Sequence, residues 1–453
     1  MVIDRSLRIK QGWHRKVLGL SWPVILSNLS IPMVGLADVA VMGQLSDPSY
    51  IGAITVGAAV FSAIYWLFGF LRMGTTGLVA QSFGTGKWSE IARTYSRSLI
   101  IAMFLGLLLI AIQIPLELGL FGLFNASDNV ESMAREYFTI RILSAPAVLI
   151  SLASIGVLFG LQKMKTTLFL TIFLNLTNLT LDVVLVLVFE LGVKGVAIGT
   201  LISEWSSAAL ALYLVVHHLR QNVHQQITLE SLFQRDEFSR LFDVSGNLIL
   251  RTFIVQVPFF VGTLLATEMG DNLLATHGIL MQLYFIMTYG LDGFAHTAES
   301  LCGYYFGAKA RNEFRKACYY CGLWTAVLAS FIALIYFSFS NEFIEQMTRS
   351  KDVQLTANQF APWIAISPIL SAGAFMLDGV FIGITQIRQM RNSMFFAGLC
   401  WGLTLLLTYP SLNYHSVWLA MSTFMVTRTL FLGCYLTKVL QVVNKWPNRT
   451  PSG

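Results

Sequence analysis

Residues 137–160 read YFTIRILSAPAVLISLASIGVLFG, a stretch of 24 residues in which Arg141 carries the one charge. An α-helix rises 1.5 Å per residue, so about 20 apolar residues cross the ~30 Å hydrocarbon layer of a bilayer. Similar stretches recur from Val17 almost to the C-terminus. Of the 453 residues 55% are hydrophobic and only 12% are charged, against about 25% charged in a soluble globular domain. The composition therefore excludes an ordinary soluble protein.

Polar, Gly-bearing and Pro-bearing breaks divide the chain into a series of candidate membrane spans. The predicted fold class is an all-α integral membrane protein with twelve transmembrane helices. Their expected ranges are 17–45, 52–80, 97–118, 137–160, 166–190, 195–217, 245–268, 273–301, 317–340, 360–386, 392–410 and 415–438.

The basic residues indicate which side of the membrane each loop faces. With the N-terminus inside, 22 of the 30 Lys and Arg residues fall in inner segments. The outer loops hold four: Arg135, Lys194, Arg349 and Lys351. Because short cytoplasmic loops are enriched in Lys and Arg, we expect a multi-pass protein of the cell (inner) membrane with both termini in the cytoplasm.

The two halves of the chain resemble each other at an offset of 223 residues. At this offset Phe83-Gly84 and Glu90 fall on Phe306-Gly307 and Glu313, and Leu158-Phe159-Gly160 falls near Phe381-Ile382-Gly383. Six spans per half is an even number, so the halves have the same orientation, which is the parallel repeat used by some secondary transporters. We expect an N-lobe over 1–218, a cytoplasmic linker over 219–244, and a C-lobe with a short cytoplasmic tail over 245–453.

The absence of nucleotide-binding and hydrolytic motifs narrows the function. The sequence has no G-x-x-x-x-G-K-[ST] stretch, no H-E-x-x-H and no G-x-S-x-G, which disfavours an ATP-driven pump or a hydrolase. Cys318 and Cys321 form a C-x-x-C pair, but no second pair or nearby His completes a zinc set. We expect no enzyme activity and no cofactor, and a membrane enzyme or channel remains the minor alternative. Transport driven by an ion gradient is favoured, and ionisable residues within spans mark where to look.

Three polar residues of the N-lobe reach the same depth on different spans. Asp38 lies about 20 residues into the first span and Asp182 about 16 residues into the fifth, and both spans rise from the inside. Thr200 lies about five residues into the sixth span, which descends from the outside. All three are therefore predicted in the outer half of the N-lobe.

Neighbouring positions extend this polar group. Asn175, Asn178 and Asp182 are spaced i, i+3, i+7, so they line one helical face. Glu204 follows Thr200 by one turn on the sixth span. Glu204 belongs either to this pocket or to a pair with a basic residue, or it faces lipid headgroups.

A carboxylate at this depth is costly when it is charged and alone, so it favours taking up a proton or holding a cation. Asn amides and a Thr hydroxyl can supply oxygens to Na⁺ or bond to the acid. The alternative is that Asp38 and Asp182 only cap or cross-link helices. Pro23 and Pro32 interrupt the first span and permit it to bend, although either proline could instead hold a static kink.

The C-lobe carries Asp292, Glu299 and Asp378, each roughly 18 to 25 residues into a span that descends from outside. These three acids are expected in the inner half, where Asp292 and Asp378 are candidates for gating or helix pairing. Glu299 is expected near the membrane edge, where it could simply be solvated. Arg72 and Arg251 are candidate partners for these acids, or anchors to lipid headgroups.

Four stretches together resemble the multidrug and toxic compound extrusion (MATE) family of transporters, most of all the branch typified by DNA-damage-inducible protein F. They are PMVGLADVAVMGQL (32–45), LRMGTTGLVAQSFGTG (71–86), NLTNLTLDVVLVLVFELGVKGVAIGT (175–200) and LDGFAHTAESLCGYYFGA (291–308). The resemblance covers nearly the whole chain, as twelve spans in two six-helix lobes.

The resemblance implies export of hydrophobic, often cationic, organic compounds in exchange for H⁺ or Na⁺. It places the cation or proton site on Asp38, Asn178, Asp182 and Thr200, and the bending proline on Pro23. Glu204 departs from the mostly apolar pocket of the family, which would favour cationic substrates or add a titrating group. The expected partners are small organic molecules and the lipid bilayer, with no nucleic acid, and we expect a monomer. A flippase for a lipid-linked or amphipathic metabolite is the alternative within transport.

Overall fold

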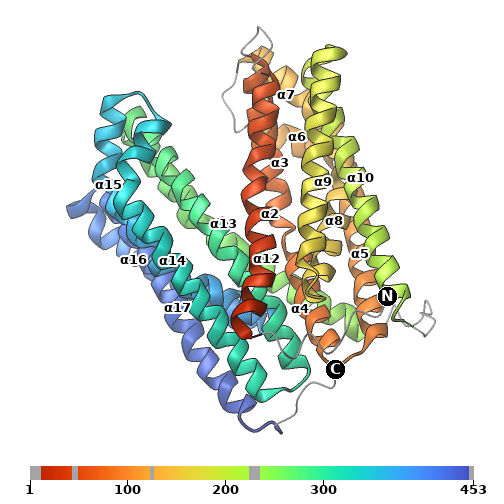
Figure 1. Cartoon of the computed structure of the whole chain (residues 1–453). Helices are drawn as coiled ribbons and strands as arrows, with labels where there is room; N and C mark the ends of the chain where they lie inside the picture. Colours follow the sequence, from red (N-terminus) through yellow and green to blue (C-terminus); the bar gives the residue numbers. More distant parts are fainter. Residues whose placement is uncertain (1–11, 43–48, 123–126, 224–234, 448–453) are drawn as a thin grey trace. The chain divides into compact units, whose positions relative to one another are not determined.

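The computed structural model describes residues 12–42, 49–122, 127–223 and 235–447, and at 31–40 and 235–242 it describes the backbone alone. No β-strand is present in these ranges. The described chain is therefore all-α, as the series of hydrophobic spans predicts (Figure 1).

The first half of the chain forms a series of helices linked by short turns. They are α2 (Trp13–Met42), α3 (Ser49–Leu67), α4 (Phe70–Gly84), α5 (Trp88–Ala111), α6 (Gln113–Phe121), α7 (Asp128–Arg141), α8 (Ala145–Gly160), α9 (Met164–Asp182) and α10 (Gly192–Arg220). A 3₁₀ turn, η1 (Ile142–Ser144), joins α7 to α8, and a π-helical turn, η2 (Val183–Val188), continues α9.

The second half consists of six long helices. They are α12 (Arg235–Glu268), α13 (Asp271–Gly307), α14 (Arg311–Met347), α15 (Lys351–Gly383), α16 (Ile387–Leu412) and α17 (His415–Val443). Ten segments of the described chain are long and apolar enough to cross a membrane. With α2 and α13 they make up the twelve predicted spans.

Several helices begin earlier than the hydrophobic pattern predicts. The structure starts α5 at Trp88 instead of residue 97, α14 at Arg311 instead of 317, and α15 at Lys351 instead of 360. The added turns are polar, as in the RNEFRK start of α14. A hydrophobicity pattern detects the part of a helix that lies in hydrocarbon, so it misses polar turns that continue the same helix beyond the membrane.

The chain separates into two compact units. One comprises residues 26–241 and the other residues 1–25 with 242–453. The division therefore falls inside α2, between Ile25 and Leu26. Each unit has its own buried core, with residues such as Tyr95 and Val157 in the first and Tyr284 and Phe424 in the second.

The internal repeat is visible in the way one helix pair packs in each unit. In the first unit α8 packs on α4, and Gly156 and Gly160 of α8 lie against the α4 backbone at Arg72 and Ala80. In the second unit α15 packs on α13, where Gly379 and Gly383 lie against the backbone at Ala295, Glu299 and Gly303. The contact positions correspond at the offset of 223 residues. Gly156 and Gly160 correspond to Gly379 and Gly383, and residues 72 and 80 correspond to residues 295 and 303. Glycine pairs four residues apart let membrane helices approach backbone to backbone.

The helix ends that follow these contacts also repeat. The helices α8 and α15 end in left-handed residues, Gln162 (φ 60°) and Thr385 (φ 55°). In both ends a 6→1 backbone bond closes the turn, from Lys163 N to Leu158 O (2.7 Å) and from Gln386 N to Phe381 O (2.9 Å). This is the Schellman arrangement, and the two copies again differ by 223 residues. The structure therefore confirms the internal repeat: the two units share the same backbone geometry at these helix contacts and helix ends.

We predict that Gly156→Ala and Gly379→Ala each destabilise the protein. An added Cβ would overlap the backbone of the facing helix, and overpacking of this kind costs about 1–3 kcal/mol. Thermal unfolding in detergent, followed by size-exclusion chromatography, measures the loss. Gly433→Ala is the matched control, because nothing lies within 4 Å of a Cβ at that position. Equal melting temperatures for all three variants would contradict the assigned packing.

Candidate functional site

Asp182 is the last residue of α9 and lies fully buried in the first unit. The π-helical turn that follows it is a wider turn than the α-helix, and such turns often occur at functional positions. The carboxylate lies against α10, because a Cβ at Gly199 would overlap Asp182 Oδ1. Glycine at 199 therefore provides the room that the acid occupies.

Asn178 and Thr200 join Asp182 at the same contact between α9 and α10. Asn178 Nδ2 donates a hydrogen bond to Thr200 Oγ1 (3.2 Å), and the two residues are only 2% and 6% exposed. Three of the four residues predicted for the coupling site thus converge in space. The fourth, Asp38, lies in α2, but its side chain falls outside the described residues.

The amide oxygen of Asn178 is a buried hydrogen-bond acceptor that a bound ion could satisfy. Asn178 Oδ1 is buried and accepts no hydrogen bond within the described part of the chain. A buried acceptor without a donor is costly, and a bound cation or a protonated carboxyl would satisfy it. The oxygen-rich donor set of carboxylate, amide and hydroxyl suits H⁺ or Na⁺.

The same face of α9 contacts the second part of α2. Asn175 Nδ2 donates to the backbone oxygen of Ser30 (3.3 Å), and the hydroxyls of Ser27 and Thr171 are 2.6 Å apart. Asn175 therefore ties α9 to α2 at the last residue of α2 before the stretch whose side chains are not described. Pro23 is buried and lies within the continuous helix α2.

Glu204 pairs with an arginine, which was one of the alternatives for this residue. Its Oε1 lies 3.5 Å from Nη2 of Arg141, with the two side chains 12% and 17% exposed. Arg141 also donates to the Tyr137 hydroxyl (2.7 Å) and stacks over the ring of Phe61 at 4.8 Å. The pair joins α10 to α7, so the negative charge of Glu204 is compensated by a neighbour.

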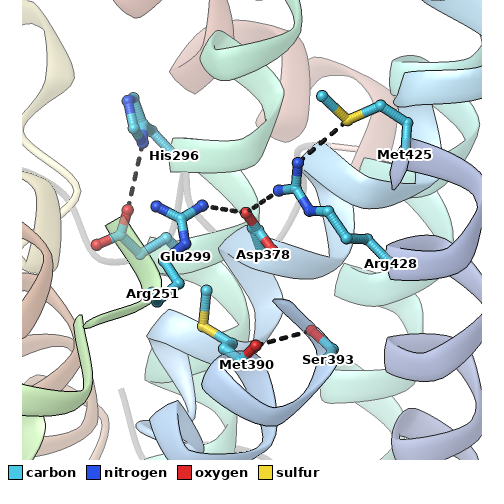
Figure 2. A network of polar contacts seen from close by, with 8 residues as sticks. All are labelled: Arg251, His296, Glu299, Asp378, Met390, Ser393, Met425 and Arg428. Carbon is cyan, nitrogen blue, oxygen red and sulfur yellow. Dashed lines mark hydrogen bonds and ion pairs between the residues drawn. The ribbon is translucent and has the colours of Figure 1, made fainter. Parts of the chain in front are cut away.

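The second unit holds a buried ion cluster around Asp378 (Figure 2). Asp378 Oδ2 accepts from Arg251 of α12 and from Nη2 of Arg428 of α17, the latter at 2.6 Å. The side chains of Arg251, Asp378 and Arg428 are 11%, 8% and 3% exposed. Arg251 is thus a partner of Asp378, which was one of the alternatives for this arginine, and the cluster cross-links three helices.

The remaining ionisable candidates take no part in the ion pairs of Asp378 with Arg251 and Arg428. Glu299 is fully buried, 3.3 Å from Nδ1 of His296, so the alternative of a solvated residue at the membrane edge is wrong. Figure 2 shows this pair beside the Asp378 cluster. Asp292 lies on α13 and is half-buried. Arg72, in the first unit, stacks over the ring of Phe159 at 5.4 Å.

Two arginines that complete these ion pairs were not assigned a role from sequence. Arg428 is the second partner of Asp378, and Arg141 is the partner of Glu204. The available signal was their position within or at the end of predicted spans, where an arginine nearly always has a polar partner. Sequence alone does not say which acid each arginine meets.

Comparisons of the sequence and of the structure with known proteins point to the same family. The MatE family model matches residues 23–184 and 248–409. DNA damage-inducible protein F of Escherichia coli is 34% identical over 427 residues, covering 93% of this chain and 91% of that protein. Multidrug export protein MepA of Staphylococcus aureus is 22% identical and covers 66% of each chain. A crystal structure of a MATE protein in a bent conformation matches with a TM-score of 0.87 at 17% identity, covering 98% of this chain and 99% of that one.

We predict that Asp378→Asn is more destabilising than Arg251→Leu. Removing the carboxylate leaves two buried guanidinium groups without their counter-charge, which costs about 3–5 kcal/mol. Removing Arg251 leaves Asp378 and Arg428 as a one-to-one pair. Thermal unfolding of the purified variants measures the difference, with Asp352→Asn as the control, because Asp352 is exposed in the first turn of α15. The reverse order of stability would contradict the role assigned to Asp378.

Proposed function

This chain belongs to the MATE family, and from that premise we propose that it is a secondary active multidrug efflux antiporter. It exports hydrophobic or cationic organic compounds in exchange for H⁺ or Na⁺, by alternating access. We further propose that it lies in the inner membrane as a monomer with both termini in the cytoplasm, in line with the distribution of Lys and Arg.

The observation that supports this proposal most is the buried group formed by Asp182, Asn178 and Thr200. A fully buried carboxylate in a membrane-spanning unit changes its charge when it binds or releases a proton or cation. The Asn178 amide and the Thr200 hydroxyl are 3.2 Å apart, one turn before Asp182 on α9 and next to Gly199 on α10, and they supply further oxygens. This group can therefore exist in a loaded and an empty state that differ by one charge.

Loading changes the energy of the surrounding helices. The empty, charged state favours a hydrated cavity, whereas the loaded, neutral state lets the helices close around it. In the proposed cycle Asp38 of α2 shares the ion with Asp182, and Pro23 allows α2 to bend when the charge is removed. A ligand shifts a conformational equilibrium only by its difference in affinity for the two states, and here that difference is the cost of burying the charge.

We propose that substrate and ion use the first unit in turn. Because Arg141 neutralises Glu204, that acid does not provide a free negative charge for a cationic substrate. Recognition of cations then rests on Asp38 and Asp182 in their empty state. This makes the exchange obligatory, since a loaded acid no longer attracts the organic cation.

Transport by carboxylate variants tests the function directly. We expect Asp38→Asn and Asp182→Asn to abolish gradient-driven efflux of a fluorescent organic cation such as ethidium from proteoliposomes, because neither amide can cycle its charge. Asp128→Asn should retain efflux, since Asp128 is exposed at the start of α7. A pH gradient and a Na⁺ gradient imposed separately identify the coupling ion. Full efflux by either of these two variants would refute the mechanism.

A subtler variant tests the position of the Asp182 carboxylate. Gly199→Ala places a methyl group where Asp182 Oδ1 now lies, and the carboxylate, at the end of its side chain, can rotate away without disrupting the fold. We expect ion-driven efflux to fall by about tenfold, the effect of ~1.4 kcal/mol, with an unchanged Tm. Gly278→Ala, where nothing lies within 4 Å of the added Cβ, is the control. Unchanged efflux would show that the position of this carboxylate does not matter.

A further inference from the structure

A cavity of about 550 Å³ opens in the second unit, and its lining includes none of the residues of the proposed transport site. It lies between the start of α14, the last third of α15 and the last turns of α17. Its lining includes Arg315, Lys316 and Tyr319 of α14, Met376 of α15, and Leu436 and Leu440 of α17. None of these residues takes part in the Asp378 cluster.

The charge at this cavity is positive. Arg315 is exposed and donates to the neutral side-chain oxygen of Asn444 (3.5 Å), and none of the described carboxylates lies in salt-bridge range of it. Lys316 pairs with Glu313 at 3.2 Å, but the two side chains are 50% and 25% exposed. An exposed pair of this kind is weak and easily exchanged. The rim of the cavity therefore has a net charge that an anion can neutralise.

The rest of the lining is apolar or aromatic. Leu436 and Leu440 are one turn apart, so they present one continuous apolar strip. Tyr319 is 64% exposed, and tyrosines commonly lie at the level of lipid headgroups. Met376 packs closely against Gly322 of α14, because a Cβ at Gly322 would lie 3.3 Å from Met376 Cε.

We propose that this cavity binds an acidic phospholipid from the cytoplasmic leaflet. Arg315 and Lys316 hold the anionic headgroup, and an acyl chain lies along Leu436, Leu440 and Met376. The basic start of α14 is on the side that the Lys and Arg distribution assigns to the cytoplasm, where acidic lipids attract basic residues. A small soluble anion would leave the apolar strip uncovered, and a zwitterionic lipid would leave the basic rim without a counter-charge. The site does not depend on the transport proposal.

Photolabelling in lipid nanodiscs tests the site. The intact protein is placed in nanodiscs of phosphatidylcholine and phosphatidylglycerol that contain a trace of a lipid with a diazirine on its acyl chain, with either headgroup. After irradiation, mass spectrometry maps the labelled peptides. We expect the phosphatidylglycerol probe to label the peptides that carry Tyr319, Met376 and Leu440. The phosphatidylcholine probe should label them at least about fivefold less, as expected from the attraction of basic residues for acidic lipids.

Three variants separate this site from general lipid contact. Arg315→Gln with Lys316→Gln should lower labelling by the acidic probe about fivefold, and Leu436→Trp should lower it by filling the cavity. Arg388→Gln, which removes an exposed arginine paired with Asp243 elsewhere in this unit, should leave it unchanged. Equal labelling by both probes, or no effect of the double glutamine variant, would overturn the proposal. Displacement by soluble glycerol phosphate would also overturn it, because it would indicate a site for small anions.

Discussion

Close backbone contact between helices at two glycine pairs is the constraint on which both units depend. Between helices surrounded by lipid, apolar side chains gain little from association, so tight packing has to provide the attraction. Gly156 and Gly160 let α8 approach α4, and Gly379 and Gly383 let α15 approach α13. Each pair is followed by a left-handed residue that ends the helix at once. The repeat preserves backbone geometry where two helices must meet, and it leaves side chains elsewhere free to differ.

The side chains around the buried acids differ between the two units. Asp378 of the second unit lies between two arginines and cross-links three helices. Asp182 of the first unit lies against Gly199, beside an amide and a hydroxyl. At the offset of 223, leucine takes the place of Asp182 and isoleucine that of Asp378. The shared scaffold thus carries a buried acid against a glycine of the facing helix in one half and a buried acid held by two arginines in the other.

Sequence reasoning predicted properties that depend on position along a helix. Depth placed Asp182 and Thr200 at one level, and the i, i+3, i+7 spacing put Asn178 on the face of Asp182, which agrees with the observed contact. It could not predict which acid Arg141 and Arg428 would meet, because that depends on the rotation of each helix about its axis and on which helices are neighbours. Burial of Glu299 was missed for the same reason, since distance from a helix end does not tell whether protein or water surrounds a residue. The early starts of α5, α14 and α15 were missed because polar turns carry no hydrophobic signal.

Helix α2 connects these observations, because it belongs to both compact units. Its first part is anchored by Ser21, whose hydroxyl lies 2.8 Å from that of Thr297 on α13, and its second part by the contact of Ser27 with Thr171 on α9. Pro23 lies between these two anchors. Proline has no N–H to donate to the carbonyl one turn earlier, so bending there breaks no backbone hydrogen bond of its own. Asp38 lies further along the same helix, so in the proposed cycle a change of its charge would act on the part of α2 that follows Pro23. A bend of α2 at Pro23 would therefore cost less backbone hydrogen bonding than a bend elsewhere between the two anchors.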